Sequence, residues 1–184
     1  MDYRAFYHLE DYLFDTVRIR FREQGYLSAF DFFCIVIWKA NRAKTKMARR
    51  LKSKGHVSLD SAVQALTSGI ARKGSAKERL RYMLEEWGFY LPMASAILTV
   101  LYPEEFTVYD SRVCNQLGCF HDLYNITTFD RLWHRYLDFR QTVEKSVPGC
   151  LNLRDKDRYL WGKSFFEQLT SDVANGFART EPVN

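Results

Sequence analysis

The sequence has few residues that interrupt regular structure. Its 184 residues include only four prolines and nine glycines, and no low-complexity linker divides the chain. The longest apolar run, 32–38, is far shorter than the roughly 20 residues of a membrane-spanning helix, and the mixed charged and aromatic segment 1–22 is unlike a signal peptide. We therefore expect one cytoplasmic domain over 1–184, with no membrane partner.

Several chemical signatures are also absent. The four cysteines, Cys34, Cys114, Cys119 and Cys150, fit no zinc or iron–sulfur spacing, and the four histidines show no metal spacing either. No glycine-rich nucleotide loop and no serine or cysteine nucleophile motif is present. We accordingly expect reduced thiols, no metal and no cofactor.

Apolar residues recur at the three- and four-residue intervals of amphipathic helices. Ser28 and Ser75 begin capping boxes, Gly25 and Gly55 end helices, and Pro92 suits a first helical turn. The run 32–38 is also compatible with a buried strand, but it continues without a turn signal into a stretch rich in alanine, lysine and arginine. The predicted class is all-α, with 107–109 extended, a frayed tail from 177, and helices over about 3–22, 28–51, 58–71, 75–87, 92–101, 110–117, 129–146 and 154–175.

The positive charge is unevenly distributed. The net charge is +5, and the segment 39–54 holds eight lysines and arginines with no acid; a second basic run spans 72–81. Such clusters suit a polyanion. A solvated helix face is the alternative, although such faces usually mix the two signs. Candidate DNA-binding residues are Lys39, Arg42, Lys44 and Lys46. In the charge-dense segment 153–161, Asp155 and Asp157 are expected to be salt-bridge partners.

The most informative segment is 87–117, WGFYLPMASAILTVLYPEEFTVYDSRVCNQL. It predicts the end of one helix, a tight turn with Gly88, a second helix, a loop, and Asp110 at the start of a third helix. Backbone N–H groups in a hairpin between helices can bind a DNA phosphate without reading sequence. Asp110 should stay ionised, because a helix N-terminus favours the anion. The alternative role for Asp110 is an ordinary N-cap, worth about 1 kcal/mol.

This segment resembles the helix-hairpin-helix DNA glycosylase superfamily. Members carry a Leu-Pro-Gly-x-Gly-like hairpin, a small-residue helix and a later Val-Asp-x-x-Val segment whose aspartate is catalytic. Gly88, Phe89 and Tyr90 would form the hairpin turn, Ala94 would be the small residue, and 109–113 would be the aspartate segment. The resemblance implies a compact helical domain with a helix-hairpin-helix element, a hairpin and catalytic segment at about 80–117, and a catalytic Asp110.

Two positions depart from the family pattern. Tyr90 replaces the second hairpin glycine, and Pro92 stands where bifunctional members carry the lysine that attacks the sugar. The resemblance therefore implies a monofunctional enzyme, in which water is the nucleophile and the product is an abasic site. Such an enzyme would act in base excision repair or in defence against modified phage DNA. Lys39, which directly follows Trp38, or Lys163, two residues after Trp161, could replace the missing amine and give lyase activity.

The chemistry explains which other residues matter. Breaking an N-glycosidic bond builds positive charge on the sugar, which a carboxylate stabilises while it orients water. The base, which could be oxidised, alkylated or hypermodified, must leave the stack and enter a pocket. Trp38, Tyr109 and Trp161 are candidate pocket walls, with burial in the core as the alternative for each. Arg112 and Lys163 are further candidate DNA-binding residues. The expected partner is double-stranded DNA with a flipped modified base, bound by a monomer.

Two other functions are compatible with the sequence. A non-catalytic DNA-binding helix-hairpin-helix module would use the same hairpin and basic segment, but it gains nothing from an acid near phosphates. An unrelated helical bundle could bind an acidic protein partner through its basic face. Strong salt dependence of binding to random duplex DNA would favour either DNA-binding function over this last one.

Overall fold

The computed structural model of the protein describes residues 3–147, 149 and 151–177. All regular secondary structure within these residues is helical, which confirms the predicted all-α class. The α-helices are α1 (Leu9–Tyr12), α2 (Arg18–Gln24), α3 (Ala29–Ala40), α4 (Lys44–Lys52), α5 (Leu59–Ala71), α6 (Ala76–Arg81), α7 (Leu91–Leu101), α8 (Ser111–Leu117), α9 (Phe129–Ser146) and α10 (Leu153–Ala174).

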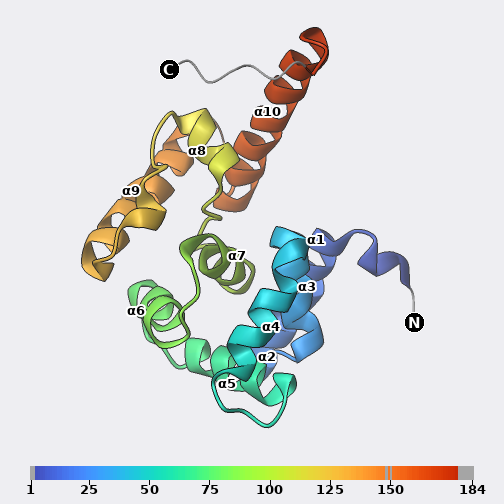
Figure 1. Cartoon of the computed structure of the whole chain (residues 1–184), viewed down its shortest axis with the longest axis vertical. Helices are drawn as coiled ribbons and strands as arrows, with labels where there is room; N and C mark the ends of the chain where they lie inside the picture. The colour runs from blue at the N-terminus through green and yellow to red at the C-terminus, as the bar shows by residue number, and fades with distance from the viewer. Residues whose placement is uncertain (1–2, 148, 150, 178–184) are drawn as a thin grey trace.

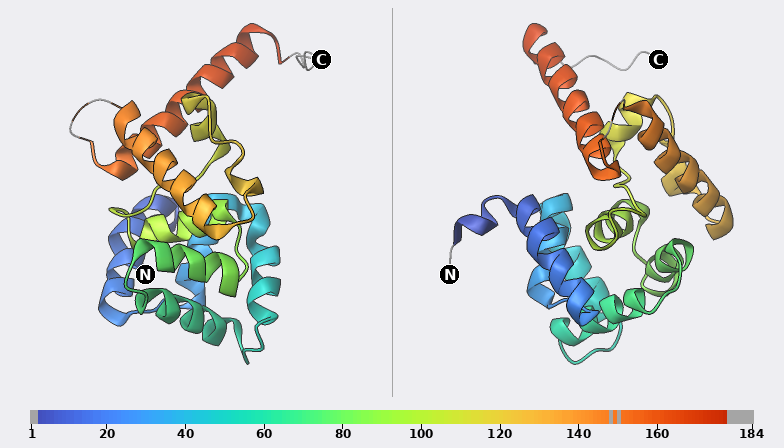
Figure 2. Two further views of the ribbon diagram at one scale, coloured as in Figure 1. Left: turned by 90° about the vertical axis from the view of Figure 1, so that its left-hand side faces the viewer. Right: turned by 180° about the vertical axis from the view of Figure 1, so that it is seen from behind.

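Helix α7 lies at the centre of the fold, between the helices α1–α6 and the helices α8–α10 (Figure 1). Nearly all of its side chains are buried, and it contacts α2, α3 and α6. On its other side α8, α9 and α10 pack against one another. Figure 2 shows from two further directions that the C-terminal part of α10 extends beyond the other helices.

Aromatic side chains fill much of the core. Phe32, Phe106, Tyr136 and Phe139 are fully buried. The Tyr136 hydroxyl donates to the carbonyl of Thr107 at 2.6 Å and accepts from its N–H at 3.1 Å. Because both backbone polar groups of Thr107 are satisfied in this way, the core holds the segment that leads to Asp110.

Local signals correctly placed several helix ends. Gly25 ends α2 with a left-handed φ of +75°, as its lack of a Cβ allows. Ser75 and Glu78 form the predicted capping box, and the helix 129–146 is confirmed as α9. A second capping box, Ser58 with Ser61, begins α5.

The predicted helix over 28–51 is wrong as a single element. It is divided into α3 and α4 by extended backbone at Ala40 and a 3-10 turn over Asn41–Ala43. The Asn41 side chain accepts a hydrogen bond from Lys44 Nζ at 3.0 Å, across the 3-10 turn that separates the two helices. The predicted start at residue 3 is also wrong, since a 3-10 turn at Tyr3–Phe6 precedes α1.

The remaining expectations concern cysteines, metals and membranes. Cys34, Cys114 and Cys119 are free thiols, while Cys150 and the tail 178–184 lie outside the described residues. In the described part of the chain, no three or more His, Cys, Asp or Glu side chains are grouped so that they could hold a metal ion. None of the helices described there is both long and apolar enough to cross a membrane.

Candidate active site

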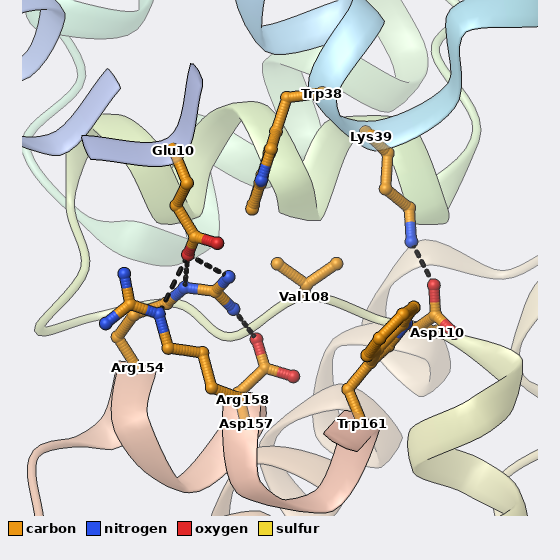
Figure 3. Close-up of a pocket in the computed structure, with 9 residues that line it drawn as sticks. All are labelled: Glu10, Trp38, Lys39, Val108, Asp110, Arg154, Asp157, Arg158 and Trp161. Atoms are coloured by element: carbon orange, nitrogen blue, oxygen red, sulfur yellow. Dashed lines mark hydrogen bonds and ion pairs between the residues drawn. The ribbon is translucent and has the colours of Figure 1, made fainter. Parts of the chain in front are cut away.

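A pocket of about 350 Å³ lies where α1, the end of α3, the segment before α8 and the start of α10 meet (Figure 3). Four of the residues singled out in the sequence meet in it: Trp38, Lys39, Asp110 and Trp161. The other residues that line it are Glu10, Val108, Arg154, Asp157 and Arg158.

Extended backbone before α8 places Asp110 in the pocket. Successive side chains of an extended segment point to opposite sides, so Val108 and Asp110 line the pocket while Tyr109 is buried in the core. The Tyr109 hydroxyl donates to the Phe120 carbonyl at 2.7 Å, and its N–H donates to Ser95 Oγ at 2.9 Å. The prediction that Tyr109 forms a pocket wall is therefore wrong.

Asp110 is the N-cap of α8 and the partner of Lys39. One carboxylate oxygen accepts from the N–H of Arg112 at 2.9 Å, and the other accepts from Lys39 Nζ. Burial by itself would raise the pKa of Asp110. The Lys39 ammonium and its hydrogen bond, together with Arg112, outweigh burial and hold the pKa below its ordinary value of 3.8. Asp110 is thus ionised at neutral pH.

Lys39 lies deeper in the site than the sequence suggested. It precedes the break after α3, its side chain is 13% exposed, and Figure 3 shows it reaching toward Asp110. In this structure the partner of its ammonium group is the Asp110 carboxylate, and a role in binding DNA stays a prediction. The only sequence signal was its place next to Trp38 in a segment without acids.

Two indoles border the pocket from opposite parts of the chain. Trp38 is half-buried and packs edge-on against Phe14, with ring centroids 6.1 Å apart. Trp161 is 44% exposed and stacks on Phe165, with a centroid distance of 5.8 Å and an interplanar angle of 6°. The Arg112 guanidinium lies 5.3 Å from the Trp161 ring centroid. Flat apolar walls of this kind suit a planar ring.

The wall opposite Asp110 is charged, and the sequence did not identify it as part of a site. Glu10 Oε1 accepts from Arg158 Nε at 2.8 Å and from Arg154 Nε at 3.0 Å. Arg154 also pairs with Asp157, and Arg158 pairs with Asp155 at 2.9 Å. Both aspartates are therefore salt-bridge partners, as expected.

Burial and the two arginines shift the pKa values of the two acids in this wall in opposite directions. Asp157 is almost fully buried, and burial raises its pKa to about 6 although Arg154 opposes the shift. Burial also acts to raise the pKa of Glu10, but Arg154 and Arg158 outweigh it, and the pKa lies below its ordinary value of 4.5. The wall therefore gains a proton at Asp157 before it gains one at Glu10.

The hairpin turn lies beside a basic surface. Gly88 has a left-handed φ of +67°, and the N–H of Phe89 donates to the Met83 carbonyl at 2.9 Å. The Phe89 side chain is also buried, so neither its side chain nor its N–H is free to bind a phosphate in this structure, although it was a predicted DNA-binding residue. Tyr90 is 60% exposed, and the Arg50 guanidinium lies 5.1 Å from its ring centroid. We define the hairpin basic surface as the shallow depression and exposed ring formed by Lys46, Arg49, Arg50, Lys54, Trp87, Gly88 and Tyr90.

Besides Phe89, four of the predicted DNA-binding residues lie in neither the pocket nor this surface. The Arg112 guanidinium donates to Gln168 at 2.9 Å, next to the Trp161 ring. Arg42 and Lys44 are exposed around the break between α3 and α4. The Lys163 side chain is 49% exposed and lies 3.7 Å from Glu167, one turn along α10.

Comparisons with protein-family models, with curated proteins and with solved structures found no match for this chain.

Proposed function

We propose that this protein is a DNA glycosylase that hydrolyses the N-glycosidic bond of a damaged or modified base and leaves an abasic site, with Asp110 as its catalytic carboxylate. One observation carries the proposal. An ionised, largely buried carboxylate opens on a pocket that two indoles border.

The geometry supplies what base excision needs. The departing base leaves positive charge on the sugar ring, and a fixed carboxylate in a partly desolvated site stabilises that charge. The same carboxylate can orient the water that attacks the sugar. Trp38 and Trp161 line the pocket, and their indoles would provide aromatic surface for a flipped base to pack against, a contact that enzymes acting on flipped bases commonly use. The charged wall around Glu10 and Arg154 would meet the polar edge of the base.

The hairpin basic surface is suited to duplex DNA, the expected partner. Lys46, Arg49, Arg50 and Lys54 lie on or directly after α4, which follows the pocket-lining end of α3 with only a 3-10 turn between them. Cations on one face bind the phosphates of duplex DNA without reading its sequence. Bound phosphates would hold the strand while a single nucleotide turns out into the pocket.

The test is direct. The protein is incubated with DNA that is undamaged or that carries 8-oxoguanine, alkylated bases, uracil or the modified cytosines of phage DNA. Abasic sites are counted with an aldehyde-reactive probe, for the wild type and for Asp110→Asn. We expect abasic sites on one class of substrate in the wild type and a loss of that signal in the variant.

The second candidate is a non-catalytic DNA-binding helix-hairpin-helix module. The observation in its favour is that Asp110 has two structural partners, Lys39 and the N–H of Arg112. A carboxylate with these partners could serve only to hold α3 and α8 together. Tight, salt-dependent binding to duplex DNA without base release on any substrate would favour this function.

A further inference from the structure

We propose that helix α10 joins two copies of this protein into a dimer, in which the same apolar face of the helix from each copy packs against the other. We call this face the α10 seam. It consists of Tyr159, Gly162, Phe166, Leu169 and Val173, with Phe165 at its border. The inference does not depend on the proposed reaction, and it departs from the monomer expected from the sequence.

The first argument is the spacing of the seam. Its five positions follow one another at alternating steps of three and four residues, the pattern of a helix that packs along another helix. The face of α10 that meets the core is a different one. Its buried residues are Asp157, Leu160 and Ser164, which at 3.6 residues per turn lie on the side of the helix roughly opposite to Phe166. The apolar pattern of the seam is therefore not needed for packing α10 onto its own domain.

The second argument is the exposure of the seam. Its large side chains and that of Phe165 are each between 41% and 69% exposed. Nothing lies within 4 Å of a Cβ placed on Gly162, so the seam is open there too, and the backbone of a second helix could approach closely. Because the C-terminal part of α10 extends beyond the other helices (Figure 2), this half of the seam is accessible to another molecule.

The exposed end of α10 is closed as a regular helix. The N–H of Gly176 donates to the Val173 carbonyl at 3.2 Å, and the N–H of Phe177 donates to the Asp172 carbonyl at 2.7 Å. Gly176 has a left-handed φ of +59°. These are the bonds and the backbone conformation of a Schellman cap. The seam therefore has its helical geometry before any partner binds.

The third argument is charge, which favours a second copy over DNA. Between 159 and 177 the charged residues are Lys163, Glu167 and Asp172, one cation against two acids, and Lys163 lies 3.7 Å from Glu167. Such a surface has no excess of cations with which to bind phosphates. A nearly neutral apolar face can instead meet its own copy without repulsion, as a two-fold symmetric interface requires.

The fourth argument is area. Aromatic side chains bury about 150–250 Å² each when they are fully covered. With the exposed fractions of the seam, of Phe165 and of the adjacent Phe177, a second copy would cover roughly 500–700 Å² on each side. Specific interfaces begin at roughly 600 Å² per partner. The seam is therefore large enough for a reversible dimer, with a dissociation constant in about the micromolar range.

The test is sedimentation equilibrium of the full chain from about 1 to 100 μM, the range in which a small interface associates. We expect the average mass to rise from that of one copy toward that of two copies. The same association should persist in about 0.5 M sodium chloride, because salt screens exposed charges but does not weaken apolar contacts.

Two variants act on the seam and one serves as a control. Phe166→Ser changes its middle, and Val173→Ser changes the part that extends beyond the other helices. Because a two-fold interface uses each position twice, each variant should raise the dissociation constant by at least about 10-fold. Phe30→Ser removes an equally large side chain, 58% exposed on α3, and should change the constant by less than about twofold. Circular dichroism at low concentration will show that each variant is folded.

The outcomes decide between a second copy and other partners. A wild type that stays a single copy over the whole range would overturn the inference. A dimer that neither seam variant weakens, or that Phe30→Ser weakens as much, would place the interface elsewhere and also overturn it. Binding to phosphatidylcholine vesicles that Phe166→Ser abolishes, without any change in mass in solution, would assign the seam to a lipid surface instead.

Discussion

Replacing Gly88 with alanine should separate the stability of the turn at Gly88 from the proposed binding of DNA by the hairpin basic surface. Gly88 has a φ of +67°, a region in which an L-residue costs roughly 1–2 kcal/mol. For a chain of this length that loss corresponds to a fall in Tm of about 2–8 °C. A Cβ at Gly88 would also lie 2.8 Å from an Nη atom of Arg50.

The contact with Arg50 should change DNA affinity more than stability. The end of an arginine side chain is flexible, so it can move away from a new methyl group at little cost. It would then leave its position 5.1 Å from the Tyr90 ring. We expect affinity for duplex DNA to fall by roughly 2- to 10-fold, or about 0.4–1.4 kcal/mol, because Arg50 is partly exposed and water screens much of its charge.

Gly25→Ala is the matched control. Gly25 has a similar φ of +75°, and nothing lies within 4 Å of the Cβ it would gain. Thermal unfolding should show comparable losses of stability in the two variants, while fluorescence anisotropy with labelled duplex DNA should show weaker binding only for Gly88→Ala. Equal DNA affinities in the two variants would refute the role assigned to the hairpin basic surface.

Three further predictions follow from the charges and hydrogen bonds. Burial raises the pKa of Asp157 to about 6 in the folded protein, so its ionisation destabilises the folded state as pH rises from about 4 to 6. In urea titrations across that interval, the free energy of unfolding of the wild type should fall relative to that of Asp157→Asn, and a constant difference between the two proteins would contradict this. Arg50→Gln should reduce the slope of log affinity for duplex DNA against log salt by about one, and an unchanged slope would remove Arg50 from the phosphate contacts. Ser95→Ala should lower the free energy of unfolding by about 1–3 kcal/mol in chemical denaturation, because it leaves the buried N–H of Tyr109 without its acceptor. Thr99→Val removes a hydroxyl that is bonded within α7 and should lower it by less; a larger loss for Thr99→Val would contradict this prediction.

Local patterns predicted the helices well because caps and periodicity depend on neighbouring residues. Ser75 with Glu78, the left-handed Gly25 and the extended segment before Asp110 are all set by a few adjacent positions. The break after α3 was missed because Ala40 and Asn41 carry no glycine or proline, and the alanine, lysine and arginine around them favour continued helix.

The pocket was only partly predictable because it joins distant segments. Lys39 and Asp110 are 71 positions apart, and Glu10 and Arg154 are 144 apart. No local pattern indicates that these charges meet.

The wrong prediction of Tyr109 as a pocket wall has a different cause. The extended backbone that turns Asp110 toward the pocket must turn its neighbour into the core, so alternation along this segment would have excluded Tyr109.

The measurement that tests the central claim most directly is the single-turnover rate of base release by Asp110→Asn. Asparagine is as good an N-cap as aspartate, so α8 should keep its start while the negative charge is lost. On the substrate identified by the panel assay, we predict a rate about 10²- to 10³-fold below that of the wild type, with DNA affinity within about twofold. Equal rates in the two proteins, or no base release by the wild type from any DNA in the panel, would contradict the account.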